Sequence, residues 1–166
     1  LSPTLFAIFL NSLLDLLKED NLGIDIEGFN LPTLAYADDI VLMSNNTNNL
    51  QELVNRCFKW CEQWGMRANI SKCGSMSVPC ARQCKLNWGE NPIPQCDHYK
   101  YLGVIFQNNG NWQRHLKKIK DTANSRLKKY KRHLNNYKLN TNLKKRIYEE
   151  NIRSQMEYGC ASSWGE

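Results

Sequence analysis

The stretch Leu31–Ser44, LPTLAYADDIVLMS, places two adjacent aspartates between two apolar runs. Apolar, β-branched runs on either side of a short polar break are typical of a β-hairpin. The stretch therefore predicts strands over Leu31–Ala37 and Ile40–Ser44, with Asp38-Asp39 at the bend. One interpretation of the pair is a solvated turn, because Asp favours turns. The other is a divalent-cation site, because Mg²⁺ prefers carboxylate oxygens and a bend holds two of them together.

Helical periodicity lies on both sides of this hairpin. Apolar residues at intervals of three and four predict a helix that begins at Ser2-Pro3 and is closed by Gly23. A second helix is predicted from Thr47 to Gly65. Short β-prone runs follow, and they predict three further strands: Ser75–Val78, Leu86–Trp88 and Asp97–Phe106. The turn before the last of them is predicted to run through Gly89, Asn91, Pro92 and Pro94.

The last third of the chain is predicted to be helical. After the break at Asn108-Asn109-Gly110, apolar residues recur from Trp112 to Tyr137, which predicts one helix about 39 Å long. Its aromatic residues fall on the apolar stripe and are expected in the core. A final helix is predicted from Thr141, with these residues inward: Leu143, Ile147, Tyr148, Ile152 and Met156. The fold class is α+β, with helices beside an antiparallel sheet.

Charge is distributed unevenly along the chain, whose net charge is +6. Residues 1–50 hold one basic and seven acidic residues, whereas residues 111–166 hold fourteen basic and five acidic ones. An acidic start suits a cation site and a basic end suits a polyanion, although a solvated helical surface is the alternative. No apolar run reaches the roughly 20 residues of a membrane span. With no signal peptide, we expect an intracellular protein of the nucleus or cytoplasm, neither secreted nor membrane-bound.

Seven cysteines cannot all pair within one chain. Cys57 and Cys61 lie on the apolar stripe of a predicted helix, where reduced thiols pack as small hydrophobic groups. This favours a reducing, intracellular setting. A zinc site is the alternative, although the spacing of its candidate ligands contains no close pair; they are Cys73, Cys80, Cys84, Cys96 and His98.

The order of several motifs resembles a known enzyme family. Tyr36-Ala37-Asp38-Asp39 resembles the YADD signature of reverse transcriptases. Leu1-Ser2-Pro3 is similar to the end of their template-contacting motif, and the block from Gly65 to Lys72 is similar to the one that follows the signature. Further on, two more segments resemble the primer-grip hairpin and the thumb end of non-LTR retrotransposon polymerases: Tyr99–Val104, and Tyr158-Gly159 with Trp164. The resemblance covers essentially the whole chain.

The resemblance implies a partial polymerase palm over residues 1–108 and a basic, α-helical thumb over residues 109–166. It implies an enzyme that extends a DNA primer on an RNA template with deoxynucleoside triphosphates, by two-metal nucleotidyl transfer. The cofactor implied is Mg²⁺, with Mn²⁺ as an alternative. Asp38 and Asp39 would be catalytic metal ligands. Lys72 would lie near the triphosphate as a proton donor, with a solvated lysine as the alternative.

The resemblance also implies nucleic-acid contacts along the chain. Ser2 and Pro3 would contact the template. Tyr36 would lie against the primer end or the nucleotide, and Tyr101, Leu102 and Gly103 would hold the primer, with an ordinary strand as the alternative. The thumb's basic residues would follow the backbone of the hybrid; they are Lys117, Lys118, Lys128, Lys129, Lys131 and Arg132.

One part of the family's site has no counterpart in this sequence. The family's third carboxylate lies on a strand upstream of the first helix, and Asp15, Asp20 and Asp25 match no motif for it. The chain begins with Leu1 rather than Met, so we expect an N-terminal part of the same polypeptide to be missing and the isolated chain to be inactive. Three interpretations stay open: a truncated polymerase, a decayed remnant, and a non-catalytic nucleic-acid-binding protein.

Overall fold

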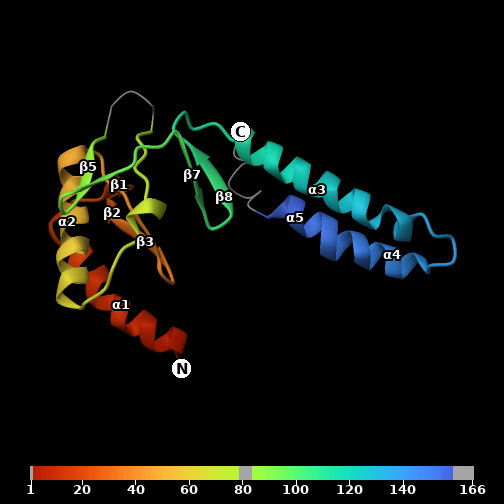
Figure 1. Cartoon of the computed structure of the whole chain (residues 1–166), viewed down its shortest axis with the longest axis horizontal. Coiled ribbons are helices and arrows are strands. Elements are labelled where there is room, and N and C mark those ends of the chain that lie inside the picture. The colour runs from red at the N-terminus through yellow and green to blue at the C-terminus, as the bar shows by residue number, and fades with distance from the viewer. Residues whose placement is uncertain (1, 79–83, 159–166) are drawn as a thin grey trace. The chain divides into compact units, whose positions relative to one another are not determined.

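A computed structural model describes residues 2–78 and 84–158 (Figure 1). These residues form two compact units, one of residues 2–77 and 84–96 and the other of residues 97–158 together with Val78. Helices and short antiparallel hairpins make up both units, which confirms the predicted α+β class. The sequence predictions that rest on Leu1, Cys80, Gly159 and Trp164 lie outside the described residues.

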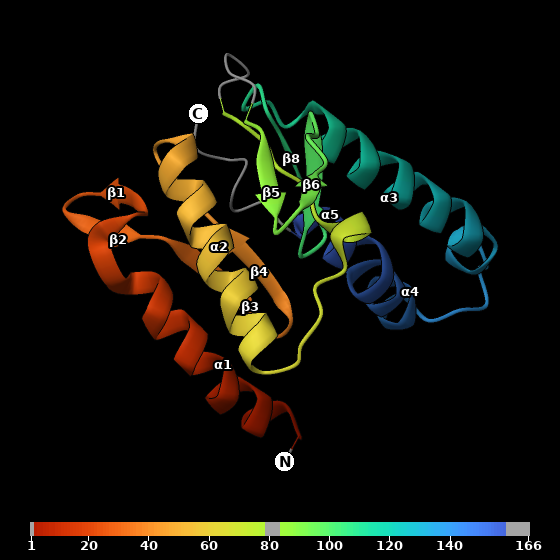
Figure 2. The same cartoon turned by 60° about the vertical axis from the view of Figure 1, so that its left-hand side comes forward.

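Two helices form the framework of the first unit. They are α1, Ser2–Lys18, and α2, Thr47–Gln63, and both are confirmed. Asn46 is the N-cap of α2, since its side-chain oxygen accepts a hydrogen bond of 2.8 Å from the backbone N–H of Asn49. Figure 2 shows α1 and α2 running side by side.

The predicted end of α1 at Gly23 is wrong. The α-helix ends at Lys18, and the 3₁₀ turn η1, Glu19–Asn21, follows. Asp20 and Asn21 have φ values of 64° and 49°, in the left-handed region that stops a helix. Gly23 instead allows the backbone at Leu31 to come close. A Cβ at this position would lie 2.4 Å from the carbonyl carbon of Leu31.

Arg56 of α2 closes the C-terminal end of α1. Its Nη1 atom donates to the carbonyl oxygens of Leu16 at 3.0 Å and Glu19 at 3.4 Å. Its Nη2 atom donates to the carboxylate of Asp20, and this bond raises the pKa of Arg56 above its usual value. A cation is favourable at this position because the last carbonyls of a helix carry partial negative charge.

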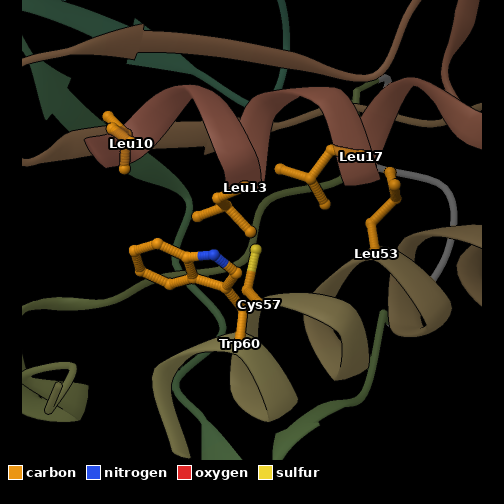
Figure 3. Packing of buried hydrophobic residues seen from close by; sticks show 6 residues of the cluster. All are labelled: Leu10, Leu13, Leu17, Leu53, Cys57 and Trp60. Atoms are coloured by element: carbon orange, nitrogen blue, oxygen red, sulfur yellow. The ribbon is translucent and has the colours of Figure 1, made fainter. Parts of the chain in front are cut away.

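The core of the first unit lies between the two helices (Figure 3). Leu13 and Leu17 of α1 and Leu53 of α2 are at most 1% exposed. In Figure 3 they point toward one another, together with Leu10, Cys57 and Trp60. The indole N–H of Trp60 donates to the hydroxyl of Ser12 at 3.0 Å, so the buried ring also satisfies its polar atom.

The YADD segment forms a hairpin whose bend differs by one residue from the prediction. Its strands are β3, Thr33–Tyr36, and β4, Asp39–Leu42. Asp39 is the first residue of β4 and pairs with Tyr36, so the bend is Ala37-Asp38 rather than Asp38-Asp39. The bend lies one residue earlier because Ala37 adopts a φ of 52°, which allows a turn of two residues.

A further hairpin of the first unit was not predicted. It consists of β1, Ile24–Ile26, and β2, Phe29–Leu31, joined through Glu27-Gly28. Both turn residues have positive φ, 53° and 83°, as a tight two-residue hairpin turn requires.

The next hairpin corrects two predictions. Its strands are β5, Leu86–Trp88, as predicted, and β6, Asn91–Ile93. Asn91 and Pro92 therefore belong to a strand rather than to the turn. The predicted strand Ser75–Val78 is wrong, because only Ser75 makes a bridge, to Gln95, and the 3₁₀ turn η2, Ile70–Lys72, precedes it.

The side chain of Gln51 in α2 takes the place of a neighbouring strand beside β5. Its amide nitrogen donates to the carbonyl of Asn87, and its amide oxygen accepts from the N–H of Asn87, both at 2.8 Å. Both backbone groups of Asn87 are thereby satisfied.

The second unit begins with a hairpin where one strand was predicted over Asp97–Phe106. Its strands are β7, His98–Tyr101, and β8, Val104–Gln107. Leu102 and Gly103 form the turn with φ values of 45° and 86°. The pattern did not reveal this turn because Leu102 is not a typical turn residue.

The helix after this hairpin is shorter than predicted. It is α3, Gln113–Leu134, and its 22 residues span about 33 Å. Tyr137 lies beyond it and is 86% exposed, so the prediction of a core position for Tyr137 is wrong. The residue buried most deeply in α3 is instead His115, which is 2% exposed.

The final helix is confirmed, with a π-helical interruption. It consists of α4, Thr141–Tyr148, the π-helix η3, Glu149–Arg153, and α5, Ser154–Glu157. Of the predicted inward residues Ile152 is 3% exposed, whereas Leu143, Tyr148 and Met156 are 43–45% exposed. None of the helices in the described part of the chain is long and apolar enough to cross a membrane.

Candidate active site

The β3–β4 hairpin has one face on the core and one face open. Opposed residues of an antiparallel pair share a face and successive residues alternate. Ile40 and Leu42 pack against the core between α1 and α2, so Asp39 and Val41 lie on the opposite face. Tyr36, opposite Asp39, is 65% exposed on that open face.

The two carboxylates at the bend are both exposed. Asp38 lies in the turn, and Asp39 begins β4. Their oxygens match what Mg²⁺ takes as ligands, and one or two protein carboxylates are its common share in sites that also use substrate phosphates. Among residues 2–78 and 84–158 no group of three or more His, Cys, Asp and Glu is placed to hold a metal. Asp38 and Asp39 are therefore suited to supply two ligands of a Mg²⁺ site.

Lys72 and the two residues predicted to contact a template, Ser2 and Pro3, belong to the first unit. Lys72 is the last residue of η2, is exposed, and donates its backbone N–H to the carbonyl of Asn69 at 3.0 Å. Ser71 donates its hydroxyl to the side chain of Asn69 at 2.7 Å, which shapes this turn. Pro3 is exposed in the first turn of α1. The roles of Lys72, Ser2 and Pro3 stay predictions.

The β7–β8 turn brings together three residues predicted to hold a primer. Tyr101 ends β7, and Leu102 and Gly103 make the turn. Both turn carbonyls are bonded, because Tyr158 donates its hydroxyl to Leu102 at 2.6 Å and Lys118 donates its ammonium group to Gly103 at 2.9 Å. The contact of Tyr158 was not predicted, since no local pattern signals a bond between residues so far apart in sequence.

The basic residues predicted to follow a nucleic-acid backbone are all exposed on α3. The buried face of this helix carries His115 and Ala123. Lys117, Lys128 and Lys131 fall on the opposite face by helical spacing. The full set of predicted contacts is Lys117, Lys118, Lys128, Lys129, Lys131 and Arg132. One of them, Lys118, is bonded to the hairpin turn.

The cysteines described are all free thiols. Burial raises the pKa of Cys57 to about 12, so this thiol stays protonated at neutral pH. Cys73 and Cys96, two candidate zinc ligands, direct their thiols at the carbonyl oxygens of Asn69 and Ser75, each at 3.4 Å. In the described part of the chain no zinc-binding group forms, and Cys80 lies outside it.

Comparison with protein-family models identifies the class of protein. The family described as reverse transcriptase (RNA-dependent DNA polymerase) matches residues 1–106. This match covers more than half of the 166 residues and includes the exposed pair Asp38-Asp39. The chain belongs to the reverse transcriptase family.

Individual relatives of the chain are proteins of mobile elements. The chain is 28% identical over 137 residues to the RNA-directed DNA polymerase from mobile element jockey of Drosophila funebris, covering 78% of this chain and 14% of that protein. It is 29% identical over 122 residues to the Pol polyprotein from type-1 retrotransposable element R2 of Nasonia vitripennis, covering 66% and 12%. These matches confirm the predicted likeness to non-LTR retrotransposon polymerases. The chain spans less than a third of the length of these relatives.

Proposed function

We propose that this chain is part of an RNA-directed DNA polymerase of a retrotransposon, which extends a DNA primer on an RNA template. The observation that carries the proposal is the pair Asp38-Asp39, exposed where the β3–β4 hairpin turns, within the residues that match the family. In this proposal residues 1–108 are palm and residues 109–166 are thumb.

The hairpin supplies carboxylates at a fixed place. Asp38 and Asp39 would hold a divalent cation, Mg²⁺ or Mn²⁺, and Tyr36 on the open face would contact the primer end or the nucleotide. A divalent cation held there would favour ionisation of an attacking hydroxyl and would stabilise negative charge on a leaving pyrophosphate. Lys72 donates a proton to that pyrophosphate. A third carboxylate comes from outside the described residues, from an upstream part of the polypeptide.

The basic face of α3 supplies sequence-independent affinity. Lysine contacts to phosphates position a duplex without reading its bases. Lys117, Lys128 and Lys131 are exposed on one face of a continuous helix, which supports contacts to a nucleic-acid backbone. Each such contact makes the slope of log affinity against log salt concentration more negative by about 0.9. This face also favours the second candidate function, a non-catalytic nucleic-acid-binding remnant, because it requires no metal.

Substitution at the bend tests the catalytic proposal. In a longer polypeptide that contains this chain and extends primers, Asp38→Ala is expected to lower extension by at least about 100-fold, because a metal ligand is lost. Binding of an RNA–DNA hybrid, measured by fluorescence anisotropy, is expected to be nearly unchanged. Asp15→Ala is the matched control, since Asp15 is an exposed carboxylate on α1 outside the motif. Unchanged extension by Asp38→Ala would refute the ligand role.

The isolated chain provides a second test. With RNA template, DNA primer, deoxynucleoside triphosphates and Mg²⁺, it is expected to bind the hybrid and to give no extension, because two adjacent carboxylates make up an incomplete site. Clear extension would contradict this part of the proposal. Failure to bind the hybrid at low salt would contradict both the polymerase proposal and the binding alternative.

A further inference from the structure

The turn of the β7–β8 hairpin is tied to the helical part of the same unit at three points. The hydroxyl of Tyr158, just after α5, donates to the carbonyl of Leu102. The ammonium group of Lys118 in α3 donates to the carbonyl of Gly103. Beyond the turn, the backbone N–H of Ile105 donates to Nδ1 of the buried His115 at 3.4 Å. The turn is therefore fixed by side chains of both helical segments.

Tyr158 and Gly103 also fit each other by shape. Gly103 has a φ of 86°, and a Cβ at this position would lie 2.9 Å from Cε1 of the Tyr158 ring. Even the smallest side chain would displace the ring. The absence of a side chain at Gly103 thus makes room for Tyr158, and the hydroxyl of that ring reaches the neighbouring carbonyl of Leu102.

These bonds change what the turn presents to an anion. A free carbonyl oxygen carries partial negative charge and disfavours a nearby phosphate, whereas an ammonium group attracts one. Tyr158 donates a hydrogen bond to the carbonyl oxygen of Leu102, and Lys118 places a positive charge at the carbonyl of Gly103. An ammonium group has three donors, so Lys118 retains donors beyond the one used on Gly103.

We propose that Tyr158 is a positioning residue, which holds the Leu102-Gly103 turn in the form that receives the 3′-terminal phosphodiesters of a primer strand. This inference rests on the proposed function, because it takes the primer as the ligand of the turn. Tyr158 acts through the turn and does not itself contact the primer. Its loss therefore weakens recognition of a primer terminus while leaving the affinity of the α3 lysines for duplex unchanged.

The test uses the 166-residue chain and two forms of one RNA–DNA hybrid. One form has a recessed DNA 3′ end, and the other is a closed dumbbell without any free end. Anisotropy titrations of both give a preference for the terminus. Tyr158→Phe removes the hydroxyl and keeps the ring beside Gly103. Tyr137→Phe is the matched control, because Tyr137 is 86% exposed beyond α3.

The preference for the recessed end is expected to fall about fivefold in Tyr158→Phe, the effect of one lost hydrogen bond. Tyr137→Phe is expected to bind like the wild type, and dumbbell affinity is expected to be equal in all three proteins. An unchanged preference in Tyr158→Phe, or no preference in the wild type, would overturn the inference while leaving the proposed function intact. A wild-type chain that binds neither hybrid would refute the proposed function, and the primer role of Tyr158 with it.

Hydrogen exchange without nucleic acid tests the tie itself. In Tyr158→Phe the backbone amides of Gly103, Val104 and Ile105 are expected to exchange faster, and those of α2 in the first unit are expected to be unaffected. Equal exchange at the turn in Tyr158→Phe and wild type would overturn the inference, because the hydroxyl would then not hold the turn.

Discussion

The two units of this protein are stabilised in different ways. In the first, α1 and α2 bury an apolar core that includes Leu13, Leu17 and Leu53 at 1% exposure or less. In the second, the described residues bury fewer apolar side chains, and α3 is joined to its neighbours by polar contacts. Arg126 and Tyr130 both bond to Asn151 in the π-helix, at 2.8 Å and 3.0 Å.

This difference between the units predicts which substitutions lower the stability of each. Hydrophobic burial is roughly proportional to the area removed from water, so the first unit depends on the volume of its core side chains. The second unit depends on bonds of defined direction, which fix a geometry and contribute about 1 kcal/mol each. The hairpin that carries Asp38 and Asp39 thus packs on an apolar core, whereas individual side-chain bonds fix the geometry within the second unit.

The largest expected difference is between two leucines. Leu13→Ala removes a side chain that is 1% exposed, and it is expected to lower the free energy of unfolding of the first unit by about 3 kcal/mol. Leu127→Ala in α3, where the side chain is 45% exposed, is expected to cost less than about 1 kcal/mol. Urea unfolding followed by circular dichroism measures both. Equal losses would contradict the contrast between the two units.

An intermediate effect is expected at two glycines of the second unit. Gly103 and Gly110 both have positive φ, 86° and 71°, but only Gly103 is close to another side chain, the ring of Tyr158. Gly110→Ala is expected to cost about 1 kcal/mol from backbone strain alone. Gly103→Ala is expected to cost about 2 kcal/mol, because the ring must also move.

A second substitution separates strain from crowding at Gly103. When Tyr158→Ala is present, the extra cost of Gly103→Ala over Gly110→Ala is expected to disappear, since no ring occupies the space. Thermal unfolding of Gly103→Ala and of Gly110→Ala, each with and without Tyr158→Ala, measures this coupling. An extra cost that persists without the Tyr158 ring would show that the contact does not limit the turn.

The smallest expected effect concerns pH. Burial, and secondarily the charge of Lys118, lower the pKa of His115 below its usual value of 6.5. The unfolded chain then takes up a proton before the folded one, so the stability of the second unit is expected to fall as pH drops below about 6.5. His115→Gln is expected to remove this part of the pH dependence, whereas His133→Gln, at an exposed position of α3, is expected to retain it. Identical pH profiles for the two variants would contradict this assignment.

The sequence predicted elements whose signals are local. The apolar runs beside Asp38-Asp39 indicated the hairpin, and the spacing of Leu53 and Cys57 indicated α2. The predicted turn positions were wrong where they depend on backbone conformation. The residue types do not reveal that Ala37 and Leu102 adopt positive φ. The resemblance to reverse transcriptases indicated a hairpin at Tyr99–Val104, which the residue pattern alone had merged into one strand.

The candidate site was predictable in its residues but not in its contacts. The exposed pair Asp38-Asp39 follows from the motif, whereas its catalytic role stays a prediction. The bonds of Lys118 to Gly103 and of Tyr158 to Leu102 join residues distant in sequence, and such pairs depend on tertiary packing. Tyr137 shows the opposite error, because helical spacing continued past the point where α3 ends at Leu134.

The amide of Gln51 has a consequence for how copies of the protein behave in a crowded solution. An unpaired strand edge is a template on which a second chain can add a strand, and proteins commonly block such edges. Gln51 bonds both backbone groups of Asn87. That position of β5 therefore has no unpaired N–H or carbonyl to which an incoming strand could bond. A side chain of a helix thus blocks strand addition at the edge of this short hairpin.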